Sequence, residues 1–204
     1  MKILEVCRGS AQTLPGSRTK TGIDKQAMTG PVLIDEHGVV GDKICNRKHH
    51  GGVDQAIYIE GRLTLDWWEQ ELGRNLPPGF FGENLVIDAL DNRILAAGDR
   101  IIAGDVVLEI ASARIPCATF ARQMDDPGFV ARYRAAGRPG AYARVLQGGY
   151  VEQGQAVSVQ PYAGERIPIP EMMETFGKRL SGAERERYLA APIGIRVRDL
   201  LTRP

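Results

Sequence analysis

Short stretches of alternating apolar and polar residues recur along most of this chain and predict a protein built mainly of β-strands. The clearest stretch is 106–111, where Val106, Leu108 and Ile110 occupy every second position, the pattern of a half-buried strand. Further strand candidates lie at residues 2–8, 32–34, 56–59, 84–87, 100–102, 142–146 and 156–159. Because these strands are short and 24 glycines punctuate the chain, the pattern favours a β-barrel over a sandwich of long strands.

Two segments with helical periodicity interrupt the strands. Leu65, Trp68 and Leu72 mark one apolar face of a helix over residues 63–74, because residues three and four apart share a helix face. Residues 120–134 predict either one broken helix or two, with the break at residues 125–128, where Asp-Asp-Pro-Gly stands. We expect these segments to be helical insertions in the barrel.

The character of the chain changes after Tyr162. The Ile-Pro-Ile-Pro run at 167–170 predicts a stiff extended connector. Three helix-sized pieces follow, over residues 171–178, from Ser181 onward and over residues 194–203, and Ser181 with Glu184 forms a capping-box pattern. The sequence therefore predicts two units, a β-barrel over residues 1–162 and a small three-helix appendage over residues 163–204.

Charge and cysteine usage narrow the class of protein. The net charge of +1 provides no general attraction for nucleic acid or membranes, so an anion site would have to be local. No stretch approaches the ~20 apolar residues that a membrane-spanning helix needs, and no signal peptide is visible. Three widely spaced cysteines form neither a disulfide framework nor a CxxC metal motif. The simplest interpretation is a reduced, cytoplasmic protein.

The strongest chemical signal is the Arg-Ile-Pro-Cys run at residues 114–117, where an apolar strand ends and a helical pattern begins. Pro116 suits the start of a helix, so Cys117 lies near a helix N-terminus, where backbone N–H groups favour negative charge. Arg114 adds a positive charge close by in sequence. Such surroundings stabilise a thiolate, which attacks electrophiles or binds soft metals. The alternative is a buried core cysteine, and the local pattern leaves both interpretations open.

A second cluster combines Arg47, Lys48, His49, His50, Gly51 and Gly52. Cations and flexible glycines together suit phosphate or carboxylate binding, and the alternative is a basic surface loop. A zinc site is disfavoured, because no third ligand has a recognisable spacing. Lys25 lies in another small cationic stretch with the same two interpretations. Asn84 is a candidate for holding a heterocycle through its amide, with turn capping as the alternative.

Taken in order, several short motifs resemble the MOSC family, in particular its stand-alone bacterial YiiM type. The residues that carry the resemblance are Thr21, Gly22, Ile23 and Lys25; Gly41 and Asp42; His50, Gly51, Gly52, Asp54 and Ala56; Trp67 and Trp68; Phe81, Gly82, Glu83, Asn84 and Leu85; Gly98 and Asp99; Arg114, Ile115, Pro116 and Cys117. The resemblance covers roughly residues 1–162. The helical tail is similar to the three-helix appendage of the same type.

The resemblance implies a MOSC-type β-barrel that binds the molybdenum cofactor, a pterin dithiolene with a phosphate. It makes Cys117 the molybdenum ligand and implies reduction of N-hydroxylated compounds, such as hydroxylamino-purine base analogues, by oxygen-atom transfer to molybdenum. His50 is the candidate proton donor, because an unperturbed imidazole exchanges protons near neutral pH; its alternative role is a cofactor contact. The expected cofactor-binding residues are Lys25, Arg47, Lys48, His50, Gly51, Asn84, Arg114 and Cys117.

Two other functions compete with a reductase. One is a module that binds or carries the molybdenum cofactor or sulfur without turnover, and the other is a thiol-based redox protein that uses Cys117 alone. The chain carries no flavin, iron–sulfur or haem motif, so a reductase would need a separate electron donor, which we expect to be a flavoprotein. We expect no pyridoxal-phosphate domain, although that cofactor is bound by the family's sulfurases, and a homodimer is left open.

Overall fold

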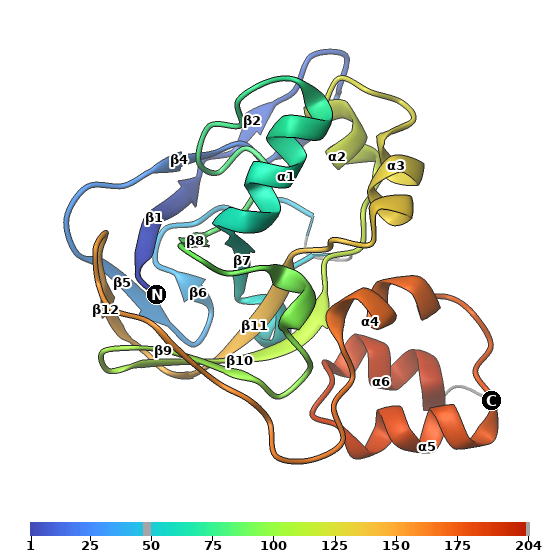
Figure 1. Ribbon diagram of the computed structural model, residues 1–204. Coiled ribbons are helices and arrows are strands. Elements are labelled where there is room, and N and C mark those ends of the chain that lie inside the picture. Colours follow the sequence, from blue (N-terminus) through green and yellow to red (C-terminus); the bar gives the residue numbers. More distant parts are fainter. Residues whose placement is uncertain (47–49, 203–204) are drawn as a thin grey trace.

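The computed structural model describes residues 1–46 and 50–202 and contains one large, strongly curled sheet (Figure 1). Its eight strands run in the order β13-β9-β10-β11-β7-β8-β1-β4. The strands are β1 (Ile3–Gly9), β4 (Lys25–Ala27), β7 (Ile57–Gly61), β8 (Leu85–Ile87), β9 (Arg100–Ala103), β10 (Val106–Ala113), β11 (Ala141–Gln147) and β13 (Ser158–Gln160). All neighbours pair antiparallel except β7 and β8, which are parallel.

The curl brings the start of the chain against the segment that precedes β13. Lys2 forms a bridge with Ala156, and the Ile3 backbone N–H donates to the Gln155 carbonyl at 2.9 Å. Among the described residues, however, these contacts do not extend into a continuous ladder. The prediction of a mainly β fold with helices is confirmed, whereas the predicted barrel is corrected to a curled sheet whose closure is short and local.

Two small sheets complete the strand inventory. One contains β12 (Gly149–Val151), β5 (Val32–Asp35) and β6 (Gly38–Val39), and the other pairs β2 (Gln12–Thr13) with β3 (Lys20–Thr21). Each of the eight predicted strands overlaps an observed strand. The strands that the sequence did not predict have only two or three residues, which is too short for alternation to be recognisable.

Six α-helices lie among the described residues. They are α1 (Arg62–Leu72), α2 (Ala118–Gln123), α3 (Phe129–Ala136), α4 (Ile169–Thr175), α5 (Gly182–Ala190) and α6 (Ile195–Thr202). The predicted helix at 120–134 is therefore two helices. The extended connector predicted over residues 167–170 is shorter in the structure, because helix α4 already begins at Ile169. Pro170 does not prevent this, since proline is compatible with the first turn of a helix. None of the helices described is both long and apolar enough to span a bilayer.

The hydrophobic core extends from the large sheet to helices α1–α3 and to the C-terminal helices α4–α6. Trp68 and Tyr133 stack with their ring centroids 5.4 Å apart, and Phe81, Phe120 and Phe129 pack around them. This aromatic cluster fixes the position of α2. Helices α4, α5 and α6 gather beside β10 and β11 (Figure 1). Helices α4 and α5 contribute buried side chains to the same hydrophobic cluster, and partly buried side chains of α6 pack against it. A unit boundary at residue 162 stays a prediction.

Candidate functional site

The end of β10 delivers Arg114 and Cys117 to the wall of a pocket. The strand ends at Ala113, the Arg114 backbone N–H still donates to the Gly140 carbonyl at 2.9 Å, and Cys117 is the N-cap residue of α2. Cys117 is half-buried rather than part of the closed core. The strand-to-helix junction that the sequence predicted at residues 114–117 is therefore confirmed.

Arg114 carries a buried positive charge. Its side chain is almost inaccessible to solvent, and its guanidinium lies 3.9 Å from the centroid of the Phe120 ring. Nη1 donates to the Ile115 carbonyl at 2.8 Å. Within the described part of the chain no carboxylate pairs with this guanidinium, and its Nε has no hydrogen-bond partner. Because a buried unpaired charge is costly, this arrangement favours an anion in the adjacent pocket.

His50 and Arg114 together favour the thiolate form of Cys117. The Cys117 Sγ lies 4.0 Å from the His50 Nε2. Burial by itself would raise the pKa of the Cys117 thiol, but His50, the Arg114 charge and the Phe120 backbone N–H lower that pKa to about 6. At neutral pH the sulfur is therefore mostly ionised, as a nucleophile or a soft metal ligand requires.

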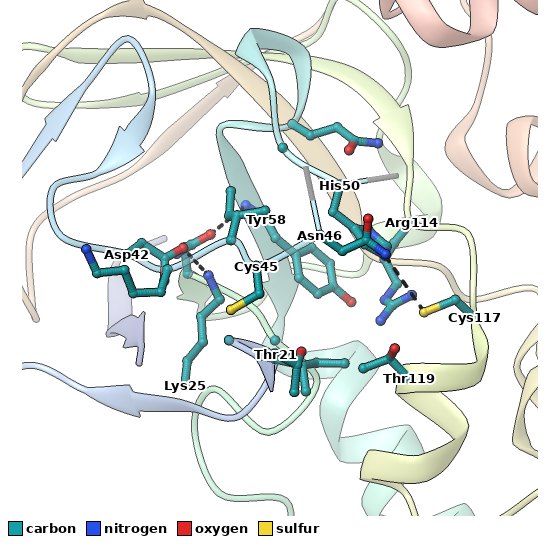
Figure 2. Close-up of a pocket in the computed structure, with 18 of the residues that line it drawn as sticks. Thr21, Lys25, Asp42, Cys45, Asn46, His50, Tyr58, Arg114, Cys117 and Thr119 are labelled. Carbon is teal, nitrogen blue, oxygen red and sulfur yellow. Dashed lines mark hydrogen bonds and ion pairs between the residues drawn. The ribbon is translucent and has the colours of Figure 1, made fainter. Parts of the chain in front are cut away.

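The pocket has a volume of about 470 Å³ and two chemically different ends. Figure 2 shows Cys117, His50 and Arg114 at one end, the ion pair of Lys25 and Asp42 at the other, and Tyr58 between them. Both members of that ion pair are nearly inaccessible to solvent. Burial lowers the pKa of the Lys25 ammonium, and Asp42 opposes this shift. The charge of Lys25 is therefore largely compensated within the protein.

Asn84 supports the Lys25 end of the pocket, and its side-chain amide already has protein partners. Its carbonyl oxygen accepts from the Tyr58 backbone N–H at 3.1 Å, and its amide nitrogen donates to the Cys7 carbonyl at 3.2 Å and to Asp42 Oδ2 at 3.0 Å. Because both the acceptor and the donors already have protein partners, Asn84 is suited to positioning Asp42. A direct contact of Asn84 with a ligand stays a prediction.

The pocket brings together the predicted site residues that the structure describes. Its walls include Lys25, His50, Gly51, Asn84, Arg114 and Cys117, although they come from four separated parts of the chain. Arg47 and Lys48 lie outside the described residues. Sequence reasoning missed Gln55, Tyr58, Thr119 and Tyr142, which also line the pocket. Nothing in their local sequence distinguishes them from ordinary strand, turn or helix residues.

Two unpartnered polar atoms mark this pocket as a ligand site. Besides Nε of Arg114, the buried Oε1 of Gln55 has no hydrogen-bond partner. Buried polar atoms are rarely left unsatisfied in native proteins, so both are suited to contacts with a bound molecule. Among the described residues, no group of three or more His, Cys, Asp or Glu side chains could hold a metal ion. A metal in this pocket would thus need ligands from a cofactor in addition to Cys117.

Comparisons with known proteins agree on one family. The sequence profile of the MOSC domain matches residues 46–158, more than half of this 204-residue chain. The uncharacterized protein YflK of Bacillus subtilis is 30% identical over 154 residues, a match that covers 74% of this chain and 70% of YflK. A protein of Gibberella moniliformis named as a reductase is 31% identical over 156 residues, which is 72% of this chain but only 27% of the fungal protein.

A comparison with solved structures identifies proteins that share this fold. The crystal structure of YiiM from Geobacillus stearothermophilus matches with a TM-score of 0.80 and 23% sequence identity, covering 98% of this chain and 96% of that one. At this identity the likeness shows the shared fold alone, while the sequence matches identify the relationship. The chain therefore belongs to the MOSC domain family.

Proposed function

We propose that the pocket binds the molybdenum cofactor and that the chain is a molybdenum-dependent oxidoreductase acting on N-hydroxylated compounds, such as hydroxylamino-purine base analogues. The observation that carries the proposal is the pair formed by Cys117 and Arg114. A thiol whose pKa is lowered to about 6 lies beside a buried guanidinium that has no carboxylate partner in the described chain. This combination suits an anionic ligand that contains a thiophilic metal.

The remaining lining residues fit the other parts of such a cofactor. The Gln55 Oε1 and the Arg114 Nε offer one acceptor and one donor for the polar edge of a pterin. Lys20 and Lys43 are exposed lining residues, and their charges suit a phosphate better than the compensated charge of Lys25 does. Lys25 would contribute indirectly, by fixing Asp42 and the wall around it.

When bound, the cofactor would supply oxygen-atom transfer and a two-electron redox couple, and the protein would orient the substrate and handle protons. His50 is placed for the second task, because its Nε2 lies at the same end of the pocket as the Cys117 sulfur. A separate flavoprotein would supply the electrons. The name of the fungal relative is compatible with such a reductase.

The proposal is tested by producing the protein in a host that makes molybdenum cofactor and measuring both metal loading and turnover. We expect stoichiometric molybdenum and many equivalents of amine from a hydroxylamino-purine with a chemical reductant or an added flavin reductase. Cys117→Ser should abolish turnover without changing the circular dichroism spectrum, while Glu174→Ala, a substitution on the exposed surface of α4, should retain it. Arg114→Met should weaken cofactor retention about tenfold to a hundredfold.

One result would contradict the reductase, and another would contradict the role of Cys117 in it. Full loading with product limited to one equivalent, despite ample reductant, would favour a cofactor carrier. Full turnover by Cys117→Ser would remove the sulfur from the reaction. His50→Ala separates the two roles of the imidazole: a proton donor slows turnover more than it lowers loading, whereas a cofactor contact lowers both equally.

A further inference from the structure

A buried carboxyl group lies behind the pocket, outside the set of residues that line it. Glu60 of β7 is fully buried, and its Oε1 accepts a hydrogen bond from the Tyr58 hydroxyl at 2.5 Å. Its other oxygen, Oε2, accepts from the Asn92 side-chain amide. Tyr58 itself lines the pocket, and Figure 2 shows its ring between the Lys25 end and the Cys117 end. The contacts thus form an unbroken path from a buried acid to the pocket.

The surrounding backbone holds this path in one geometry. Tyr58 and Glu60 are two residues apart on one strand, so their side chains share a face. Gly140, directly before β11, makes room for them: a Cβ there would lie 2.2 Å from the Tyr58 Cε2 and 2.4 Å from the Glu60 Oε1. The Asn92 amide is fixed by the Gly61 backbone N–H, which donates to its Oδ1 at 2.8 Å. Asn92 therefore presents its NH₂ group to Glu60.

The charges around Glu60 favour its protonated form. Within the described residues no lysine or arginine forms an ion pair with it, and the pKa of its carboxyl is raised to about 8 overall, mainly because the group is buried. The Glu83 carboxylate contributes to this rise, whereas the hydrogen bonds of Tyr58 and Asn92 and the Arg114 charge oppose it. The other titratable groups that face Glu60 are the phenols of Tyr133 and Tyr142.

The position of Asn92 also decides where the acidic proton resides. Because the Asn92 NH₂ occupies Oε2, the proton of a neutral Glu60 belongs on Oε1, where it can be donated to the Tyr58 oxygen. The Tyr58 hydroxyl hydrogen is then released from Glu60, which leaves the Tyr133 hydroxyl and a molecule bound in the pocket as its acceptors. A proton can move along such a chain by one transfer at each oxygen, without movement of the heavy atoms.

We propose that Glu60 is the proton reservoir of this pocket and that Tyr58 relays its proton to the bound substrate. The inference rests on the proposed reduction, in which R–NHOH, two electrons and two protons give R–NH₂ and water. The N–O bond breaks, the nitrogen is reduced, and the electrons come from the separate flavoprotein. Tyr58 gives one proton to the departing oxygen and regains it from Glu60, which is reprotonated from solvent after product release. His50 is placed to supply the other proton.

The first experiment uses the cofactor-free protein, so that it does not depend on the proposed reaction. Infrared difference spectra recorded from about pH 6 to about pH 10 should show a protonated-carboxyl C=O band that disappears with a midpoint near pH 8. Glu60→Gln should remove this band, and Tyr58→Phe should shift its frequency because a hydrogen bond is lost. Glu83→Gln is the matched control: it removes a different buried carboxyl, so the Glu60 band should remain, with a lower midpoint because the charge of Glu83 no longer raises the Glu60 pKa.

The second experiment measures turnover by the molybdenum-loaded protein. General acid catalysis contributes about a hundredfold or more to a rate, so Glu60→Gln and Tyr58→Phe should each slow turnover by about that factor. Glu60→Gln should also abolish the fall in rate above pH 8 and reduce the solvent deuterium isotope effect, which a purely structural role would not change. Both substitutions are nearly isosteric, and molybdenum content verifies that each variant still holds the cofactor.

The outcomes separate the two proposals. A missing Glu60 band, or one that Tyr58→Phe leaves unmoved, overturns the relay whatever the turnover result. Parent-like rates and pH profiles in both variants also overturn it. A loaded parent protein without any turnover contradicts the proposed reduction, and the relay's role in that reduction with it, while the infrared titration still decides the protonation of Glu60.

Discussion

The carboxylate of Asp54 ties the pocket to the C-terminal helices, and its removal gives a sharp test of the structure. Asp54 lies in the 3-10 turn η1 (Val53–Gln55), directly before the lining residue Gln55. Its Oδ1 accepts from the Arg144 Nε at 2.7 Å, and its Oδ2 accepts from the Ile195 backbone N–H at 2.6 Å at the start of α6. The Asp54 side chain is only 14% exposed. We expect Asp54→Ala to destabilise the whole protein measurably.

The size of the effect follows from these contacts. Hydrogen bonds to charged groups are each worth about 1.5–3 kcal/mol, and Asp54 makes two. The loss of a buried ion-pair partner costs about 3–5 kcal/mol when the remaining charge has no other partner. Arg144 keeps Glu109, whose Oε1 accepts from its Nη1 at 3.1 Å. Two full bonds would be worth about 3–6 kcal/mol, but both side chains of the pair are partly exposed to water that can replace the lost contacts. We therefore expect Asp54→Ala to lower the free energy of unfolding by about 2–3 kcal/mol.

Urea unfolding, followed by circular dichroism, measures this change directly. For a chain of this length a loss of 2–3 kcal/mol corresponds to a fall in Tm of about 5–10 °C. Asp54→Asn should lose about half as much, because its side-chain oxygen can still accept from Ile195. Glu174→Ala is the control: it breaks a pair with Lys178 in which both side chains are more than half exposed, so it should cost less than about 0.5 kcal/mol. Equal stabilities of Asp54→Ala and Glu174→Ala would refute the reasoning.

Three other measurements test the site. In cofactor-free protein, Cys117 should be alkylated by iodoacetamide with a pH midpoint near 6, and His50→Ala should move that midpoint upward; a parent midpoint near that of free cysteine, about 8.5, would contradict the thiolate. The pKa of Glu60 is raised from 4.5 to about 8, so its contribution to stability is full below pH 4.5 and is lost as the pH rises to about 8. Across that range stability should fall by up to about 1.4 kcal/mol per pH unit, and Glu60→Gln should flatten this slope in urea unfolding. Gly140→Ala should lower the Tm and perturb the nuclear magnetic resonance signals of the Tyr58 ring, because its Cβ would overlap that ring; an unchanged Tm would argue against the close approach.

The features that sequence analysis predicted correctly are those encoded within one continuous segment. The strand, the proline and the helix around Cys117 follow one another directly, so their order alone predicts the junction. The capping box is equally local: the Ser181 Oγ accepts from the Glu184 backbone N–H at 3.3 Å, and the Glu184 carboxylate accepts from the Ser181 backbone N–H at 2.8 Å. Local physical chemistry is sufficient at both places.

The interactions that sequence analysis did not predict join residues that are far apart in the chain. Lys25 is a plausible phosphate ligand when its own segment is considered, but Asp42 compensates its charge in the fold. Asn84 has the donors and acceptor that a heterocycle needs, yet backbone groups of Cys7 and Tyr58 already use them. No spacing along the sequence reveals such pairings, because curling of the sheet creates them.

Tyr58 shows why even a correctly predicted strand leaves its functional side chain hidden. All five residues of β7 are buried, so the strand lacks the alternation that would distinguish a face toward the pocket from a face toward the core. The direction of Tyr58 becomes apparent only from the strand beside it, where the absence of a side chain at Gly140 leaves room for the ring and for Glu60. The space left by Gly140, directly before β11, and the hydrogen bond to Glu60 on the same strand thus set the position of the Tyr58 ring. For that reason Arg114, His50 and Cys117 could be found from the sequence, whereas Tyr58 and Glu60 required the fold.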